Sequence, residues 1–274
     1  MKAMILAAGL GTRLKPWTLE HPKALVPVGG VPMLERVILS LKKQGFTEII
    51  INIHHFGEQI IDFVGSKEFG VSIKISDERG KLLDTGGGIL HAQQLLTKDN
   101  APFLIHNVDI LSNADLAELM QAHCDHSVDA TLLVSNRTSS RKLIFDNDLN
   151  LKGWHNLSTD EFKPQGLEMS ESDVELAFSG IHVMSTRCFE LMTAAGFSGS
   201  FPIMDFYLSQ ASKIKLSQIG KTDLSQAANI DLSQAGNIDI SQAGTIGIKG
   251  FCCNDLNLID IGKPDTLTQA NRLF

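Results

Sequence analysis

The chain has 274 residues, of which 43% are hydrophobic and 20% are charged, and this composition supports a folded core over most of the length. The formal net charge of −7 argues against broad binding to nucleic acid, so any phosphate ligand must be held by a local site. No apolar run is long enough to cross a bilayer, and the first residues turn polar too early for a signal peptide. We therefore expect a cytoplasmic protein with free cysteines, no membrane partner and an oligomeric state that the sequence leaves open.

The first half of the chain alternates short apolar runs, typical of buried strands, with helical patterns. Strands are predicted at residues 2–8, 48–53, 69–75, 103–110 and 130–134. Helices are predicted from Pro32 to Gly45, over residues 57–64, from the D-T-G-G-G segment to Leu96, and over residues 113–123. Such alternation predicts a mostly parallel sheet with helices on both faces, in which ligands bind at the carboxyl ends of the strands.

The second half is less regular. A hairpin is predicted at residues 142–154, further strands at 175–184 and 256–261, and helices at 186–195, 203–210 and from Pro264. The fold class is therefore α/β, with a small mixed β region added to the central sheet, and residues 1–274 are expected to form a single domain.

Residues 208–247 interrupt this pattern with five copies of an eight-residue unit that resembles L-S-Q-A-G-N-I-D. We interpret them as an insertion produced by local duplication, because the cost of closing a loop grows slowly with its length. Stacked rungs of a β-solenoid are the alternative form, since such repeats bury a face only by stacking.

A glycine-containing segment, L-A-A-G-L-G-T-R-L, follows the first predicted strand. Gly9 and Gly11 allow backbone N–H groups to turn toward phosphate oxygens, and Arg13 can hold a phosphate through two hydrogen bonds. Taken alone, the two glycines are explained equally well by a tight turn. Lys23, in the segment H-P-K-A-L-V-P-V, adds a second cation, and the combination predicts a phosphate site.

These two segments in this order resemble the sugar-1-phosphate nucleotidyltransferases, also called nucleotide-sugar pyrophosphorylases. The resemblance continues through L-D-T-G-G-G-I at residues 83–89, N-V-D at 107–109, F-S-G-I at 178–181 and I-D-I-G at 259–262. It implies a Rossmann-like nucleotidyltransferase fold and a Mg²⁺-dependent transfer of a nucleotidyl group from a nucleoside triphosphate to a sugar-1-phosphate, with release of pyrophosphate.

Within the family, the compact size and the D-T-G-G-G segment most resemble the N-acetylmuramate 1-phosphate uridylyltransferases, which makes UTP and N-acetylmuramate 1-phosphate the favoured substrates and the product a cell wall precursor. Three alternatives remain: a guanylyltransferase for mannose- or heptose-1-phosphate, a cytidylyltransferase for phosphocholine, and a non-catalytic regulatory or scaffold protein.

The resemblance also implies roles for individual residues. Arg13, Lys23, Asp109 and Asp260 would be catalytic: Arg13 binds the triphosphate, Lys23 neutralises charge where the phosphates meet, and the two aspartates hold Mg²⁺. The sugar would approach Gly180. The implied nucleotide-binding residues are Leu6, Ala7, Ala8, Gly9, Gly11, Thr12, Arg13, Lys23, Asp84, Thr85 and Gly86.

Several of these residues have a plain structural interpretation as well. Thr85 is suited to capping the helix that follows it, and Gly180 to close packing within a strand. Val108 departs from the small residue that the family often has there, and either shifts the metal ligand or fills the core. No zinc site is expected from His54, His55 and His106, because no carboxylate or thiol completes a set.

Overall fold

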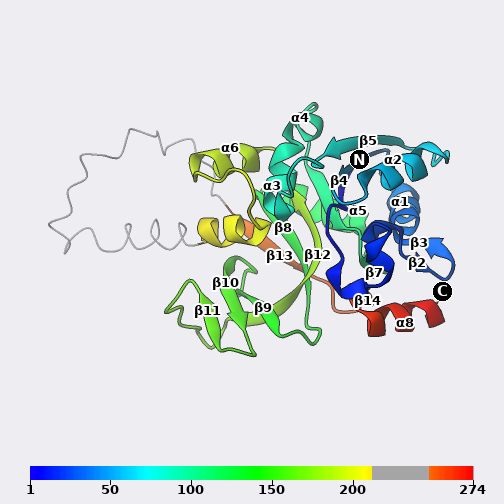
Figure 1. Ribbon diagram of the computed structural model, residues 1–274. Helices are drawn as coiled ribbons and strands as arrows, with labels where there is room; N and C mark the ends of the chain where they lie inside the picture. The colour runs from blue at the N-terminus through cyan, green and yellow to red at the C-terminus, as the bar shows by residue number, and fades with distance from the viewer. Residues whose placement is uncertain (212–246, 274) are drawn as a thin grey trace, which may run out of the picture.

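A computed structural model of the chain describes residues 1–211 and 247–273, and a sheet of ten strands forms its centre (Figure 1). The strands of this sheet are β1 (Lys2–Leu6), β4 (Glu48–Ile53), β5 (Ser72–Asp77), β6 (Phe103–Asn107), β8 (Ala130–Ser135), β9 (Arg141–Phe145), β10 (Leu151–Asn156), β11 (Glu161–Lys163), β12 (Val174–Met184) and β13 (Ile248–Cys252). Two ribbons of two strands each accompany it: β2 (Pro27–Val28) with β3 (Val31–Pro32), and β7 (Ile110–Ser112) with β14 (Leu258–Asp260).

The main path through the sheet runs β11-β10-β9-β12-β6-β1-β4-β5, and β8 pairs with both β12 and β13. The strands β6, β1, β4 and β5 are parallel to one another, as the alternation of strands and helices predicted. They are short apolar runs because both of their faces are covered, as the segment E-I-I-I-N-I of β4 illustrates.

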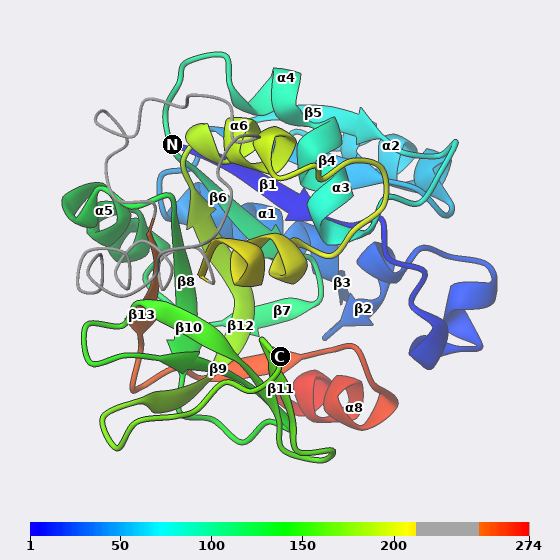
Figure 2. The ribbon, with the colours of Figure 1, turned by 90° about the vertical axis from the view of Figure 1, so that its left-hand side faces the viewer.

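Helices cover both faces of the sheet, which confirms the predicted arrangement. They are α1 (Met33–Lys43), α2 (Gly57–Gly65), α3 (Asp84–His91), α4 (Gln93–Leu96), α5 (Leu116–His126), α6 (Arg187–Ala194), α8 (Pro264–Leu273) and the helical residues 203–211, with short 3-10 turns η1 (Thr12–Leu14), η2 (Trp17–Leu19) and η3 (Lys23–Leu25). One core packs α1, α2 and α5 against the sheet, and a second core packs α3, α4, α6 and residues 203–211 against the other face (Figure 2). Among these described helices, none has the length and apolarity that a membrane span requires.

The long strand β12 joins the two parts of the sheet. It runs antiparallel between β6 and β8 near its end, and its first residues pair with β9 of the hairpin formed by β9 and β10. The register shifts between Phe178 and His182, so that the strand passes from one part of the sheet to the other around Gly180. This hairpin with its partner β11 is the mixed β region that the sequence indicated.

Strand β13 follows the repeat segment and was not predicted. It lies parallel to β8, and the residue before it, Gly247, accepts from the N–H of Asp129 at 2.9 Å and donates its own N–H to the carboxylate of Asp129 at 3.2 Å. At the other end of the insertion, Leu208 and Ala211 of the first copy are buried in the helix of residues 203–211. The copies within residues 212–246 lie outside the described residues, and their proposed form stays a prediction.

Candidate active site

A cavity of about 690 Å³ opens at the carboxyl ends of β1, β4 and β6. This is the edge where ligands bind in open parallel sheets. Its walls are formed by Leu6, Ala7, Ala8, Gly9, Leu10, Gly11, Thr12, Arg13, Lys23, Asn52, Leu82, Asp84, Thr85, Asn107, Val108, Asp109 and Ser200. All of the expected nucleotide-binding residues except Gly86 are in this set, so the structure brings them together.

The glycine-containing loop is folded around Lys23. Gly11 has a φ of 60°, and a Cβ atom there would lie 2.8 Å from both the Cβ of Lys23 and the Cγ2 of Thr18. The hydroxyl of Thr18 donates to the carbonyl oxygen of Gly11 at 2.9 Å. Only glycine combines this left-handed backbone with this lack of space, so Gly11 fixes how closely Lys23 approaches the loop.

The four residues expected to be catalytic meet beside Gly262. Lys23 and Asp109 form an ion pair, and their side chains are only 14% and 18% exposed. A Cβ atom at Gly262 would lie 2.8 Å from Oδ1 of Asp260, 3.2 Å from Nη2 of Arg13 and 3.5 Å from Oδ2 of Asp109. The absence of a side chain at Gly262 thus leaves a space that two carboxylates and a guanidinium surround.

Backbone contacts hold the two aspartates together although 150 residues separate them in the chain. Strand β14 pairs with β7 so that Asp260 lies opposite Ile110, and the N–H of Ile261 donates to the carbonyl oxygen of Asp109 at 2.9 Å. The N–H of Gly262 donates to Oδ1 of Asp260 at 2.8 Å and orients that carboxylate.

Two carboxylates at the edge of this cavity fit Mg²⁺, which is commonly held by one or two carboxylates together with substrate phosphates and water. Within the described residues, no cluster of three or more His, Cys, Asp or Glu side chains is arranged to hold a metal by itself. Val108 is 4% exposed and packs in the core on one face of the sheet, so this side chain fills space in the core.

Two further polar residues support the loop, and sequence analysis missed both. The side chain of Asn52 accepts from the N–H of Ala7 at 2.6 Å and donates to Glu78 at 2.8 Å. Asn52 is 2% exposed and Glu78 is 3% exposed. Asn52 stands in an apolar strand, and that contrast was the one signal available.

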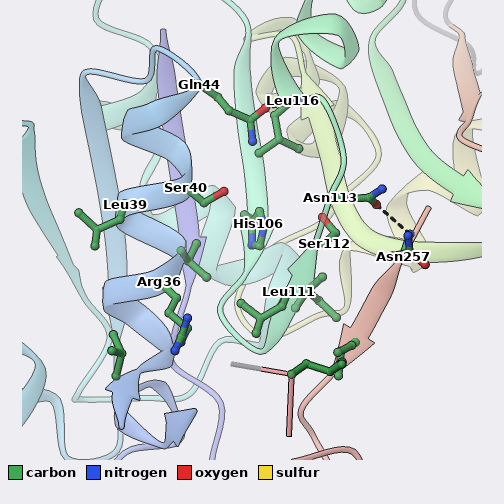
Figure 3. A pocket seen from close by; sticks show the side chains of 15 residues that line it. Arg36, Leu39, Ser40, Gln44, His106, Leu111, Ser112, Asn113, Leu116 and Asn257 are labelled. Carbon is green, nitrogen blue, oxygen red and sulfur yellow. Dashed lines mark hydrogen bonds between the residues drawn. The ribbon is translucent and has the colours of Figure 1, made fainter. Parts of the chain in front are cut away.

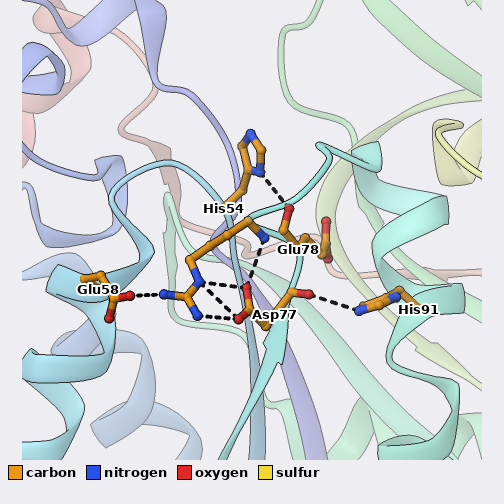
Figure 4. Close-up of polar contacts among 6 residues, drawn as sticks. His54, Glu58, Asp77, Glu78 and His91 are labelled. Atoms are coloured by element: carbon orange, nitrogen blue, oxygen red, sulfur yellow. Dashed lines mark hydrogen bonds and ion pairs between the residues drawn. The ribbon is translucent and has the colours of Figure 1, made fainter.

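The segment after β5 is held by a group of charged residues around Glu78 (Figure 4). Arg79 forms ion pairs with Asp77 and Glu58, and its hydrogen bonds lower the pKa of Asp77 to about 2. His54 donates to the carbonyl oxygen of Glu78 at 2.7 Å, and His91 donates to that of Asp77 at 3.1 Å. One ring nitrogen of His54 therefore has a structural partner.

The structure assigns packing roles to three of the expected site residues. Thr85 does not cap α3: its hydroxyl accepts from the N–H of Ile203 at 2.9 Å. A Cβ atom at Gly86 would lie 2.3 Å from the ring of Phe201, which places Gly86 behind the cavity wall. A Cβ atom at Gly180 would lie 2.7 Å from Nδ2 of Asn107. Gly180 therefore allows Asn107 to reach the cavity, and its contact with a sugar stays a prediction.

A second cavity, of about 600 Å³, lies between α1, β7 and α5 (Figure 3). Its lining contains no carboxylate, and its arginine, Arg36, donates to the carbonyl oxygen of Val28 at 2.9 and 2.6 Å. His106 lines this cavity, where burial lowers its pKa to about 4 and Asn107 accepts its hydrogen bond. The residues suited to phosphate chemistry are therefore in the first cavity.

The buried carboxyl group of Glu78 provides a test of how the loop is supported. Burial raises the pKa of Glu78 above its usual value, so its protonated form stabilises the fold at low pH and this contribution is lost as the pH rises through the raised pKa. Glu78→Gln keeps an acceptor for Asn52 and removes the charge. We expect the variant to gain about 1–2 kcal/mol of stability over the wild type at pH 8 and nothing at pH 4, measured by thermal unfolding. Equal melting temperatures at pH 8 would contradict this.

Comparison with known proteins identifies the family. The model of the nucleotidyl transferase family matches residues 2–143, which is more than half of the chain. The chain belongs to this family. The matched part includes the glycine-containing loop, Lys23 and Asp109, whereas Asp260 lies beyond it.

Two similar proteins represent the relatives. An N-acetylmuramate alpha-1-phosphate uridylyltransferase of Neisseria meningitidis serogroup B is 44% identical over 122 residues, which cover 44% of this chain and 52% of the relative. A probable mannose-1-phosphate guanylyltransferase 1 of Oryza sativa is 38% identical over 137 residues, which cover 49% of this chain and 38% of the relative. The matched regions span about half or less of the length of these relatives.

Solved structures resemble the whole fold at low sequence identity. HddC from Yersinia pseudotuberculosis in complex with GMP-PN is 21% identical with a TM-score of 0.67, and covers 100% of this chain and 99% of its own. A putative glucose-1-phosphate thymidylyltransferase from Bacillus anthracis is 19% identical with a TM-score of 0.70, and covers 100% of this chain and 94% of its own. At this level of sequence identity, the similarity to these two structures shows a shared fold.

Proposed function

We propose that the protein transfers a nucleotidyl group from a nucleoside triphosphate to a sugar-1-phosphate in a Mg²⁺-dependent reaction that releases pyrophosphate. The observation that carries the proposal is the meeting of Arg13, Lys23, Asp109 and Asp260 around Gly262, at the edge of a cavity that the glycine-containing loop also lines. Membership of the nucleotidyl transferase family supports it.

The chemistry requires positioning and charge neutralisation more than a strong base, because the attacking phosphate oxygen is already ionised. That oxygen forms a bond to the α-phosphorus, and the bond from the α-phosphorus to the bridging oxygen of the leaving pyrophosphate breaks. Arg13 and the backbone N–H groups of the loop bind the triphosphate and stabilise the charge that develops on pyrophosphate. Lys23 lies beside Asp109 and offsets the negative charge where the two phosphates meet.

Asp109 and Asp260 are the residues that would hold Mg²⁺, which supplies neutralisation of the phosphate oxygens when it is bound. Asn52 keeps the N–H of Ala7 oriented at the start of the loop, and Glu78 keeps Asn52 in place. The proposed site therefore depends on the hydrogen bonds of two buried residues in addition to the groups proposed to bind phosphate.

For the substrates, we infer UTP and N-acetylmuramate 1-phosphate. The uridylyltransferase relative is 44% identical, against 38% for the guanylyltransferase relative, which supports this order. The alternatives are GTP with mannose- or heptose-1-phosphate, and CTP with phosphocholine. A nucleoside triphosphate substrate also suits the cytoplasm, where we place the reaction.

The proposal is tested by measuring pyrophosphate release with purified protein and Mg²⁺. UTP, GTP, CTP, dTTP and ATP are each combined with N-acetylmuramate 1-phosphate, mannose-1-phosphate, a heptose-1-phosphate and phosphocholine. We expect one strong pair, UTP with N-acetylmuramate 1-phosphate. Strong pyrophosphate release with a different pair would identify that pair as the substrates instead. Triphosphate binding without turnover of any acceptor would contradict the enzyme and favour a regulatory or scaffold protein.

A further inference from the structure

A third cavity, of about 400 Å³, lies between the β9–β10–β11 region and the helix of residues 203–211. It is separate from the cavity that contains the glycine loop, and no role described above uses it. The residues that line it are Arg137, Ser139, Arg141, Lys142, Leu143, Trp154, Lys163, Phe178, Met204, Asp205 and Leu208.

The strand register puts cations and aromatic rings on one face of this region. Trp154 lies opposite Leu143 on one neighbouring strand and opposite Lys163 on the other, so all three side chains share a face. Arg141 is two residues from Leu143 and shares that face, because side chains alternate along a strand. Lys163 lies over the ring of Trp154, with its Nζ 5.4 Å from the ring centroid.

Arg137 forms the inner wall of the cavity. Its Nη2 donates to the carbonyl oxygen of Phe178 at 2.8 Å, and its own carbonyl oxygen accepts from the ammonium of Lys142 at 2.8 Å. Its Nε is buried and has no hydrogen-bond partner within the described part of the chain. A buried, unsatisfied donor on a charged group is costly, and an anion that enters the cavity would satisfy it.

The charge of the cavity is unbalanced. Among the described residues that line it, Arg137, Arg141, Lys142 and Lys163 are cations, and Asp205 is the one carboxylate. None of these five residues forms an ion pair with another of the described residues. Arg137 and Lys142 donate to backbone carbonyl oxygens and Lys163 lies over Trp154, so the contacts of these three cations are to neutral groups. Such an excess of positive charge around a cavity favours the binding of an anion.

Two observations relate this cavity to the active site. Burial lowers the pKa of Arg137, and the carboxylate of Asp260 acts on the same group in the opposite direction, which places Arg137 within electrostatic range of the metal-binding candidate. Phe178 lines the cavity two residues before Gly180, and Gly180 packs against Asn107 in the wall of the nucleotide cavity. A molecule whose phosphate reaches Asp260 can therefore extend toward Arg137.

We propose that this basic cavity binds a second acidic group on the acceptor sugar, apart from the 1-phosphate. The inference rests on the proposed function, and it defines the acceptor class as a sugar-1-phosphate that carries a further carboxylate or phosphate. Arg137 and Arg141 donate to the acidic group, Lys163 adds a point charge, and Trp154 and Phe178 provide apolar surface for the sugar ring. Neutral sugar-1-phosphates leave these cations without a partner and bind more weakly.

The test compares acceptors that differ only in the acidic group. N-acetylmuramate 1-phosphate is paired with N-acetylglucosamine 1-phosphate, which lacks the lactyl carboxylate, and glucose 1,6-bisphosphate is paired with glucose 1-phosphate. The Kd of each is measured by calorimetry without turnover, and kcat/KM by pyrophosphate release. In one of the two pairs, we expect the acidic acceptor to bind about 10- to 100-fold more tightly than its neutral partner, because charge-assisted hydrogen bonds have this strength. A preference in the first pair would identify the acidic group as a carboxylate, and a preference in the second pair would identify it as a phosphate.

The double variant Arg141→Gln with Lys163→Gln removes two exposed cations from the cavity and should fold normally. It should abolish the preference for the acidic acceptor and leave the Kd of its neutral partner within about twofold. Lys43→Gln with Lys98→Gln makes the same change of net charge on exposed residues elsewhere and should preserve the preference. Arg137→Gln should act like the double variant if it folds.

Two results would overturn the inference. The first is equal affinity of the wild type for the acidic and the neutral acceptor of each pair. The second is an equal loss of affinity for both acceptors in the double variant, because the cavity would then bind the 1-phosphate that both share. Pyrophosphate release from neutral acceptors without an acidic preference would reject the inference and keep the proposed function. A preference in binding without turnover of any sugar-1-phosphate would reject the proposed function and keep the acidic-group site.

Discussion

Asp109→Asn should lower the rate of Mg²⁺-dependent pyrophosphate release by about a thousandfold, the size of effect that removal of one key electrostatic contact to a reacting phosphate can have. The carboxylate of Asp109 is the one that faces both Lys23 and the space beside Gly262. An amide has the same shape but no charge, so it neither balances Lys23 nor attracts a divalent cation. We also expect the rate of the variant to depend less on the Mg²⁺ concentration than the rate of the wild type does.

The control for this variant is Asp125→Asn, an exposed residue of α5 that accepts a hydrogen bond from Gln121. It should leave the rate within about twofold, because exposed contacts of this kind contribute little. Circular dichroism should show that the Asp109→Asn variant is folded. Binding of the triphosphate should show that the conformation of its glycine-containing loop is preserved. Unchanged turnover in a folded Asp109→Asn protein would remove Asp109 from the proposed metal site.

Gly11→Ala is expected to damage both stability and activity. A left-handed backbone costs a non-glycine residue about 1–2 kcal/mol, and overpacking against its neighbours adds about 1–3 kcal/mol. The added methyl group would lie 2.8 Å from the Cβ of Lys23, so the lysine has to move away from its position beside Asp109. We expect a fall in kcat/KM of about 100-fold, because small displacements of positioning groups have effects of this size.

Gly30→Ala separates the two causes. Gly30 also has a positive φ, of 77°, but a Cβ atom there would meet nothing within 4 Å. This control should therefore lose only the cost of the backbone conformation, about 1–2 kcal/mol in thermal or chemical unfolding, and keep full activity. If the two variants were equally stable and equally active, close packing at Gly11 would not be what positions Lys23.

The part of the proposed site that is formed by one continuous segment of the chain was predicted from the sequence. In the proposed site, the loop that begins at Leu6 binds phosphate mainly through its own backbone, and the glycines that such a loop needs lie close together in the chain. Asp109 and Asp260 were different, because an aspartate at the end of a strand is more often a turn former. Only the resemblance to a family selected these two, and the pairing of β14 with β7 then placed both beside Gly262.

The supporting residues were missed for a physical reason. Asn52 and Glu78 act through buried hydrogen bonds across neighbouring strands, and a single polar residue in an apolar run has no sequence signature of that role. Thr85 and Gly86 were assigned to the nucleotide by the resemblance to the family, and that resemblance did not predict that Phe201 and Ile203, from a distant segment, contact them. Strand β13 was missed because I-K-G-F-C has little of the regular alternation that identifies a strand.

The sequence by itself determined most of the helices and strands of this protein and predicted the phosphate loop, because strand and helix periodicity, helix ends and glycine conformations depend on residues that are near one another in the chain. Only the tertiary structure decided which charged residues, distant from one another in the chain, lie around the same cavity. Strand register brought Arg141, Trp154 and Lys163 to one face, and the bulge at Gly180 turned β12 so that Phe178 completes the same cavity. Register and layer packing are set by the burial of apolar surface over the whole sheet, and no local pattern encodes them.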